Sequence, residues 1–417
     1  MQIGSRLLRL VVTGATIAGL IGFALVKGGT GMSTRAAAAS ATPSNKNVKR
    51  GGAVLAPTCG RPGFVQAGAQ AGAQAGSSQR PQMSEEAFKN VQLLKGIPVD
   101  EFMGAMGLFS AATSMCCLEC HAPDYAADTP RKITTRKMIQ MVNTINRTNF
   151  SGRKVVSCWT CHRQSDRPQV TPTLDVVYGE PIYWAPDDLF QQAAGAPSPD
   201  KVLDKYIQAV GGADRLAKLT SFVGKGSSTL FGGGFKSATE VYVKAPNQRT
   251  TIIHQELGDK TMAFDGRNGW LASAVTPVPV LELTGGELDG ARLDAELSIP
   301  GRVKQVLGQW RSNLPSSIAG RSVNVLQGTG AGGTATLYFD EETGLLTRVV
   351  RYANSAMGRV PTQIDYADYR EVAGVKIPFK WAFAWVSGRD EVQLTEVQPN
   401  VAIAAARFAK PAPAVPR

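Results

Sequence analysis

Two short stretches, Cys117-Leu-Glu-Cys120-His121 and Cys158-Trp-Thr-Cys161-His162, decide how the first half of this chain folds. Both have the pattern C-x-x-C-H, in which two cysteines one helical turn apart can each form a thioether to one haem vinyl group. The histidine that follows can then reach the iron from the proximal side. The motifs hold four of the six cysteines and two of the three histidines of the 417-residue chain. They predict two covalently bound haem c groups.

Two other kinds of site also use paired cysteines. Four cysteines in a C-x-x-C…C-x-x-C arrangement can hold zinc, but zinc does not explain why a histidine directly follows each pair. A thioredoxin-like redox pair is typical of a βαβ pattern, and no such pattern surrounds either motif. Haem c, with His121 and His162 as iron ligands, is therefore the prediction.

Methionine is the available residue for the sixth ligand of each iron, because the remaining histidine, His254, lies far off in a predicted strand. An M-x-x-M pair precedes each motif: Met103 and Met106 precede the first, and Met138 and Met141 follow 35 residues later. This spacing indicates an internal repeat with one haem in each unit. Methionines on an apolar helix face are also ordinary core residues, and the spacing does not say which member of a pair binds iron.

The residues around the motifs predict helices. Ser84 is suited to cap a helix that begins at Glu85, and Pro98 to open one that runs through Phe109. Thr129 and Pro130 are an N-cap and a first helical residue for a third helix. One face of that third helix is expected to carry four apolar side chains, namely Met138, Met141, Val142 and Ile145.

Residues from about 86 to 172 resemble the cytochrome c subunit of photosynthetic reaction centres. The matching stretches are Asn90-Val-Gln-Leu-Leu-Lys-Gly-Ile97 and Arg136-Lys-Met-Ile-Gln-Met141, together with the two motifs. The resemblance implies that Met106, fifteen residues before His121, and Met138, twenty-four before His162, are the sixth ligands. Met103 and Met141 are their rivals. The family's subunit has four haems in two such diheme units, whereas this chain has one unit.

Histidine–methionine ligation implies electron transfer at a raised potential, without catalytic residues. Two alternatives stay open. The first is a periplasmic carrier of an apolar ligand, or a redox sensor that uses haem as its reporter. The second is a diheme peroxidase, which would need one iron with an open coordination site.

A basic region accompanies the second motif. Residues 129–163 contain eight Lys or Arg (131, 132, 136, 137, 147, 153, 154 and 163) and no Asp or Glu, within a chain of net charge +12. Beside a haem, such a region can guide an acidic redox protein to dock; a solvated helix face is the equally weighted alternative. Nucleic-acid binding is not expected, because no binding motif accompanies the charge.

The N-terminal region predicts export. Arg6 and Arg9, the uncharged residues 10–26 and a small-residue site at 39–41 are typical of a signal peptide over residues 1–41. The protein is therefore expected in the periplasm or another extracytoplasmic compartment, and on a membrane only if this segment is not cleaved. Residues 42–82, rich in Ala, Gly and Gln, predict a flexible tether.

The remaining chain predicts a second domain. We expect a multidomain protein: a small all-α diheme cytochrome over 83–172, a proline-rich strap over 173–198, an α+β domain over 199–410 and a tail over 411–417. Within the α+β domain, alternating residues and Gly-containing turns predict antiparallel strands. Helices are expected near three ranges, 199–219, 287–293 and 301–310.

This second half resembles the periplasmic lipoprotein-sorting and lipoprotein-carrier superfamily. The resemblance rests on Phe264–Trp270, Tyr338–Leu345 and Asp368–Phe379. It implies a curved antiparallel half-barrel with helices on its concave side, which can accept an apolar ligand; alternatively the helices fill that side.

Two further features are Cys116 and a glycine-rich stretch. Cys116 has the wrong spacing for a thioether, so it is either a buried thiol or the disulfide partner of Cys59. Gly328–Gly333 satisfies G-x-G-x-x-G, but a strand follows it, which predicts a hairpin loop without nucleotide binding.

Overall fold

The structure, a computed structural model, describes residues 80–179, 189–230, 235–330 and 333–414. All of them belong to one compact unit, residues 53–417. The predicted signal peptide, the tether up to residue 79, Cys59 and strap residues 180–188 lie outside the described residues. Within the described part of the chain, no helix combines the length and the apolar character needed to cross a membrane.

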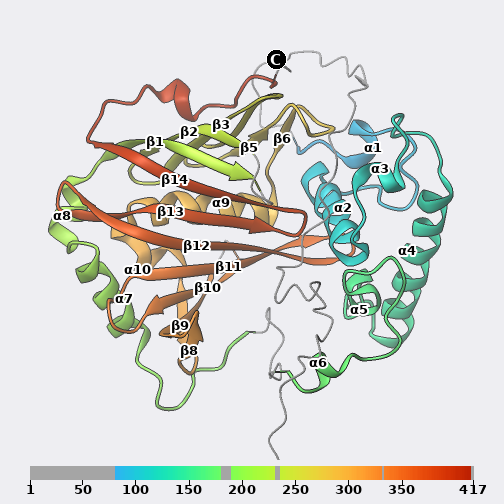
Figure 1. The fold of residues 1–417 in the computed structure, drawn as a ribbon, viewed down its shortest axis with the longest axis horizontal. Helices are drawn as coiled ribbons and strands as arrows, with labels where there is room; N and C mark the ends of the chain where they lie inside the picture. Colours follow the sequence, from blue (N-terminus) through green and yellow to red (C-terminus); the bar gives the residue numbers. More distant parts are fainter. Residues whose placement is uncertain (1–79, 180–188, 231–234, 331–332, 415–417) are drawn as a thin grey trace, which may run out of the picture. The chain divides into compact units, whose positions relative to one another are not determined.

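The first part of the described chain is helical (Figure 1). Its helices are α1 (Ser84–Ala87), α2 (Val99–Thr113), α3 (Cys117–Cys120), α4 (Pro130–Asn149), α5 (Cys158–His162) and α6 (Leu174–Val177). The predicted starts of α2 and α4 are confirmed, since Pro98 precedes α2 and Thr129 Oγ1 accepts a hydrogen bond from Lys132 N at 3.1 Å. The cap predicted at Ser84 is wrong. Ser84 is the first residue of α1, and its hydroxyl donates to the Leu94 carbonyl at 2.6 Å.

The predicted buried face of α4 is confirmed at Val142 and wrong at Met141, which is 44% exposed. The other buried residues of the helix are Ile139 and Asn146. The prediction counted only apolar side chains, but the helix also buries a polar one. Asn146 is buried because it makes specific hydrogen bonds, which are described below.

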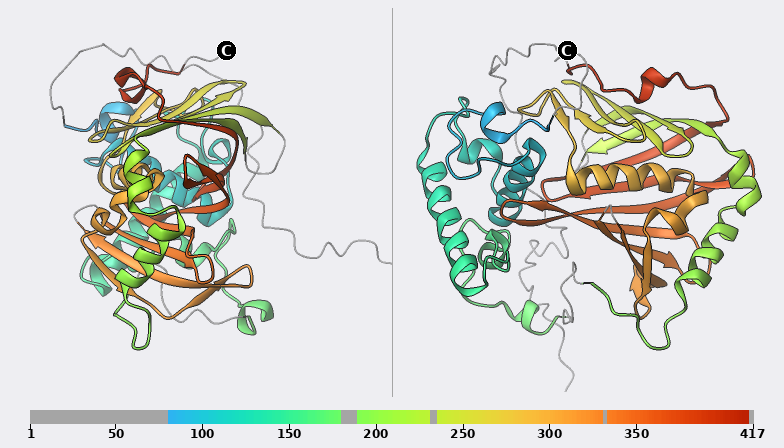
Figure 2. Two further views of the ribbon diagram at one scale, coloured as in Figure 1. Left: turned by 90° about the vertical axis from the view of Figure 1, so that its left-hand side faces the viewer. Right: turned by 180° about the vertical axis from the view of Figure 1, so that it is seen from behind.

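The second part contains one 14-stranded sheet in which every described pairing is antiparallel, as predicted. The order is β6-β5-β4-β3-β2-β1-β14-β13-β12-β11-β10-β9-β7, and β8 pairs with β9. The sheet is open, with β6 and β7 at its edges (Figures 1 and 2). The strands are β1 (Ser221–Leu230), β2 (Lys236–Lys244), β3 (Gln248–Gln255), β4 (Gly258–Phe264), β5 (Gly269–Ala272), β6 (Val280–Glu282), β7 (Gln309–Ser312), β8 (Ser316–Ile318), β9 (Arg321–Gly330), β10 (Gly333–Asp340), β11 (Leu346–Ser355), β12 (Gly358–Val372), β13 (Val375–Trp385) and β14 (Gly388–Pro399).

Some helices of this part precede β1 or follow β14, and the others lie between β6 and β7 in the chain. They are α7 (Pro199–Ala209), α8 (Ala213–Lys218), α9 (Gly285–Ser298), η1 (Pro300–Arg302), α10 (Val303–Val306) and η2 (Ala405–Phe408). Figure 2 shows α9 lying across the sheet, where it contacts β3, β4, β5 and β11.

Two helix predictions in this part need correction. The single helix expected over 199–219 is broken, because Gly211 and Gly212 have φ of +131° and +86°, values that no helix interior allows. The helix expected over 301–310 ends at Val306, and the chain then enters β7, which pairs with β9. By contrast, Gly330 pairs with Gly333 across β9 and β10, so the predicted glycine-rich hairpin is confirmed.

The helical part packs against strand ends of the sheet through α2. Gly107 faces Val386 so closely that an added Cβ would lie 2.8 Å from a Val386 methyl group. Leu108 belongs to the same apolar cluster as Met357 and Val360 of the β11–β12 hairpin. A small residue is therefore required at position 107 for the two parts to make contact.

A buried polar contact reinforces the same junction. Asp100, in the first turn of α2, accepts hydrogen bonds from the Thr284 N–H at 2.5 Å and from the Thr284 hydroxyl at 2.8 Å. Thr284 is the residue that precedes α9. The helix before the first motif is thus joined to the helix that crosses the sheet.

Candidate haem sites

The first motif forms the one-turn helix α3, with Cys116 as its N-cap residue. The Cys116 N–H donates to the Glu119 carboxylate at 2.6 Å, and the Thr129 hydroxyl donates to the Cys120 carbonyl. This second contact fixes the motif at the start of α4. His121 directly follows α3 and stacks on Tyr125, with 5.0 Å between the ring centroids.

The His121 ring is prepared to act as a neutral ligand. Its Nδ1 atom is buried and has no hydrogen-bond partner in the described structure. Burial, followed by the positive charge of Lys132, lowers the pKa of His121. A neutral imidazole is the form that binds a metal, so the ring fits the role predicted for it.

The second motif forms α5, which begins after Ser157 and includes His162. His162 Nδ1 lies 2.9 Å from the carbonyl oxygen of Ser165. With Nδ1 donating to that carbonyl, Nε2 is left as the metal-binding nitrogen, and the ring orientation is fixed. The Ser165 N–H also donates to the Ala112 carbonyl at 3.2 Å, which ties this loop to the end of α2.

The four motif cysteines are free thiols, whereas Cys116 is disulfide-bonded. Its predicted partner, Cys59, lies outside the described residues, so that pairing stays a prediction. Burial raises the pKa of Cys158 to about 11 and also raises the pKa of Cys120. Among the described residues, which include both motifs, no three His, Cys, Asp or Glu side chains gather to hold one metal ion.

The four predicted methionines lie on the two long helices. Met103 and Met106 are half-buried on α2, and Met138 is half-buried on α4, while Met141 is exposed. The sequence interpretation did not consider Met115, whose sulfur lies 3.8 Å from the Cys120 sulfur. Met115 stands in the loop between α2 and α3, and a search confined to helical M-x-x-M pairs passes over it.

Apolar side chains around both motifs are exposed. Six of them are between 40% and 52% exposed, namely Leu118, Tyr125, Ile133, Met141, Val155 and Trp159. Exposure of so many large apolar residues in a small helical region is unusual unless another apolar group covers them. A porphyrin held at each motif would supply that cover, so the residues present fit haem.

The two motifs lie at opposite ends of α4 (Figures 1 and 2). The first is fixed at the N-terminal end by the Thr129 contact. At the C-terminal end, Asn146 accepts hydrogen bonds from the Val155 and Val156 N–H groups at 3.1 and 2.9 Å and donates to the Val156 carbonyl at 2.8 Å. These bonds hold the segment that enters α5. A single 20-residue helix, about 30 Å long by its rise per residue, therefore positions both motifs.

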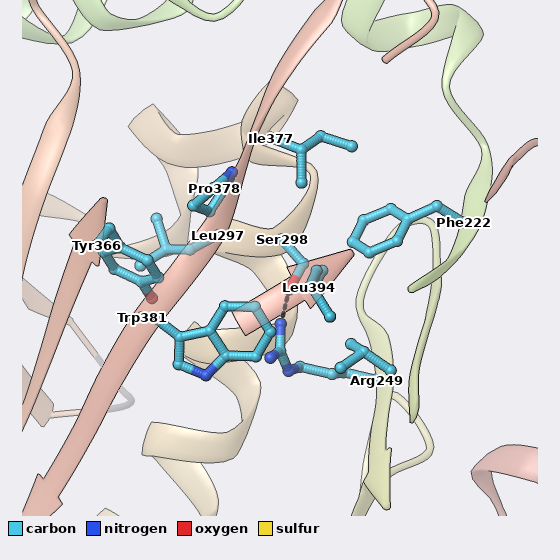
Figure 3. Close-up of a pocket in the computed structure, with 10 residues that line it drawn as sticks. Phe222, Arg249, Leu297, Ser298, Tyr366, Ile377, Pro378, Trp381 and Leu394 are labelled. Atoms are coloured by element: carbon cyan, nitrogen blue, oxygen red, sulfur yellow. Dashed lines mark hydrogen bonds between the residues drawn. The ribbon is translucent and has the colours of Figure 1, made fainter. Parts of the chain in front are cut away.

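A small cavity lies between α9 and the sheet (Figure 3). Its volume is about 30 Å³, and its lining includes Phe222, Tyr366 and Trp381. Arg249 crosses it and donates to the Ser298 hydroxyl at 2.6 Å, with its guanidinium 5.4 Å from the Trp381 ring centroid. Ligand pockets usually measure hundreds of Å³, so α9 and the side chains largely fill this side of the sheet.

Comparisons with known proteins concern the two parts separately. Residues 63–177 match the family described as "Photosynthetic reaction centre cytochrome C subunit". No significant match was found among curated proteins.

Solved structures similar to the chain cover about its second half. One is a DUF1329 family protein from Desulfovibrio piger, with 13% identity and a TM-score of 0.35, covering 50% of this chain and 97% of that chain. Another is a putative outer membrane lipoprotein-sorting protein domain from Vibrio parahaemolyticus, with 11% identity and a TM-score of 0.34, covering 49% and 97%. A third is a LolA superfamily protein from Nitrosomonas europaea, with 15% identity and a TM-score of 0.33, covering 52% and 99%.

The resemblance of the segment with the two C-x-x-C-H motifs to the photosynthetic reaction centre cytochrome C subunit, stated from the sequence, is thus found again over residues 63–177.

Proposed function

We propose that this chain is an exported electron-transfer protein that binds two haem c groups covalently. The observation that carries the proposal is the state of the motifs: each presents two free thiols on one helical turn, followed by a histidine suited to bind iron. The match to the cytochrome family over residues 63–177 supports it. When bound, the haem iron supplies reversible one-electron chemistry.

The protein's own residues would orient each haem and exclude water from it. Cys117 and Cys120 would hold the first group, and Cys158 and Cys161 the second. The Ser165 carbonyl would keep the His162 ring in its ligand orientation. Trp159, which is 43% exposed, would cover part of the second porphyrin.

Covalent attachment can be tested by mass spectrometry and a pyridine haemochrome spectrum of protein matured in a host that assembles c-type cytochromes. We expect two haems in the wild type, one in Cys117→Ser/Cys120→Ser, and two in the control Cys116→Ser. Fewer than two haems in the wild type would overturn the proposal. Rapid binding of carbon monoxide or peroxide to the reduced protein would instead favour an open iron and the peroxidase alternative.

The sixth ligands are proposed to be Met106 and Met138. Met106 lies fifteen residues before His121, and Met138 lies twenty-four residues before His162. These spacings match the ligand positions that the resemblance to the cytochrome family implies. Each has a matched control three residues away, Met103 and Met141. We expect Met106→Leu and Met138→Leu each to remove half of the near-infrared band typical of methionine-ligated ferric haem, and the control substitutions to keep it. Loss of the band in a control variant would transfer the ligand role to that residue.

The domain limits and the location are part of the same proposal. We infer a signal peptide over 1–41, a diheme domain over 83–172 and a sheet domain over 199–410. Cleavage before residue 42, read by N-terminal sequencing of the exported protein, is the expected result. An apolar ligand in the sheet domain would require α9 to move away from a cavity of about 30 Å³, and lipid extraction followed by mass spectrometry tests for one.

A further inference from the structure

Three of the four cations in the first half of the basic region lie close to carboxylates of the same part of the protein. Arg136 Nη1 lies 2.8 Å from Asp128 Oδ1, and Lys132 Nζ lies 4.0 Å from the same oxygen. Arg131 Nη1 lies 3.7 Å from a Glu119 oxygen. These cations compensate carboxylates of the α3–α4 connection. Two carboxylates, Asp128 and Glu119, therefore offset part of the charge of Arg131, Lys132 and Arg136, and Lys137 is the fourth cation of this half.

The cations at the second motif have no such compensation. Arg147, Arg153 and Arg163 are exposed, and no described carboxylate lies within 4 Å of any of them. Between Asp128 and Asp175 the sequence has a single acidic residue, Asp166. Lys154 is not counted among these free cations. Its ammonium donates to the Ser355 carbonyl of β11 at 2.7 Å and so joins this segment to the sheet.

The local fold brings these three arginines to one end of α4. Arg147 lies in the last turn of the helix, and the Arg153 N–H donates to the Phe150 carbonyl at 3.0 Å. The hydrogen bonds of Asn146 then fold the following residues back against the helix. Arg163 is the C-cap of α5, directly after His162. A favourable interaction with a helix dipole accounts for Arg147, and at the C-cap of the short α5 for Arg163, but not for Arg153.

We infer that Arg147, Arg153 and Arg163 form the docking surface for an acidic redox protein, which exchanges electrons through the second haem. The inference rests on the proposed electron-transfer function. Uncompensated cations around the second haem, and cations partly offset by carboxylates around the first, would steer an anionic partner to the end of α4 that carries the second motif. The first haem would then exchange electrons with a different redox partner.

The test uses the reduced, haem-loaded full chain and oxidised acidic plastocyanin as a probe in stopped-flow measurements. For Arg147→Glu/Arg153→Glu we expect the bimolecular rate constant to fall about tenfold at low ionic strength, and to match the wild type at high salt. Arg163 is left unchanged because it adjoins a haem ligand.

Two controls separate the alternatives. Lys201→Glu/Lys244→Glu makes the same change in net charge on the sheet domain and should alter the rate less than about twofold. Arg131→Glu/Lys137→Glu makes the same change in net charge in the first half of α4 and should slow the reaction clearly less than the test variant does. If either control slows the reaction as much as the test variant, or if the wild-type rate does not depend on salt, the docking surface is wrong. A haemochrome spectrum of every variant shows separately whether the proposed function itself has failed.

Discussion

The helical part and the sheet part bury their apolar residues in different ways. The sheet part has a large core of its own, in which Phe339, Leu337 and Leu326 are fully buried. The helical part has a small cluster, and several of its members, such as Met357 and Val360, come from the sheet. Around the two motifs it leaves large apolar side chains exposed, Trp159 among them.

This difference teaches that the two parts depend on different sources of stability. Burial of apolar surface contributes about 25 cal/mol per Å², and the sheet part obtains it from its own side chains. The helical part would obtain much of it from the two porphyrins. We therefore expect it to behave like a small cofactor-dependent domain attached to an independent one.

The largest expected effect is on the chain without haem. In haem-free protein, amides of α3, α4 and α5 should exchange at least about a hundredfold faster than in haem-loaded protein, because the exposed apolar residues lose their cover. Amides of β10 to β13 should keep their protection within about threefold. Hydrogen–deuterium exchange with mass spectrometry measures both. Equal protection of α4 with and without haem would contradict the comparison.

A second prediction concerns the core of the sheet. Phe339→Ala should lower the free energy of unfolding of the sheet part by about 3–5 kcal/mol, since the side chain is fully buried and packs on Tyr206 at 5.2 Å between ring centroids. Phe339→Leu is the milder control. The loss should be equal in haem-free and haem-loaded protein, as followed by chemical denaturation. A loss that depends on haem would show that the two parts do not have separate sources of stability.

A third prediction concerns the polar support of the second motif. Asn146→Ala should lower the unfolding free energy of the helical part by about 2–3 kcal/mol, because it removes three hydrogen bonds from a buried position. It should also alter the spectrum of the second haem and leave that of the first unchanged. Asn149→Ala, in the exposed last turn of the same helix, is the control. An effect on both haems would mean that α4 acts as one unit.

The features that the sequence predicted are those with a local cause. The starts of α2 and α4 follow from Pro98 and Thr129, whose effects on the backbone are felt within one turn. The motif residues are likewise adjacent in sequence. The carbonyl partner of His162 could not be predicted in this way, because any residue type at position 165 offers a backbone carbonyl.

The features that were missed depend on contacts between distant segments. Gly107 gives no sign in the sequence that Val386 will pack on it, and the burial of Asn146 depends on a loop that returns ten residues later. The break at Gly211 is the exception, because adjacent glycines commonly end a helix and the signal is therefore local. The space between α9 and the sheet is largely filled by side chains, and only a small cavity remains. The alternation of residues along single strands does not predict how side chains from different strands pack there.

The smallest expected effect is at the junction of the two parts. Burial raises the pKa of Asp100 above its ordinary value of 3.8, and its hydrogen bonds from Thr284 oppose the shift without cancelling it. A raised native pKa means that the folded protein binds the proton more tightly than the unfolded chain. The stabilising contribution of Asp100 is therefore complete below the ordinary pKa and is lost as pH rises through the raised value.

Asp100→Asn removes this titration. Relative to the Asn variant, the wild type should lose unfolding free energy as pH rises across that window. Because the Asn side chain has one acceptor oxygen in place of two, the variant should also lose about 1 kcal/mol at every pH. Denaturation of both proteins at several pH values measures the difference. If that difference stays constant with pH, the Asp100 carboxylate is not the group that links α2 to α9 in a buried setting. If instead it changes as expected and the loss appears in both parts of the molecule, the two sources of stability are coupled through Thr284.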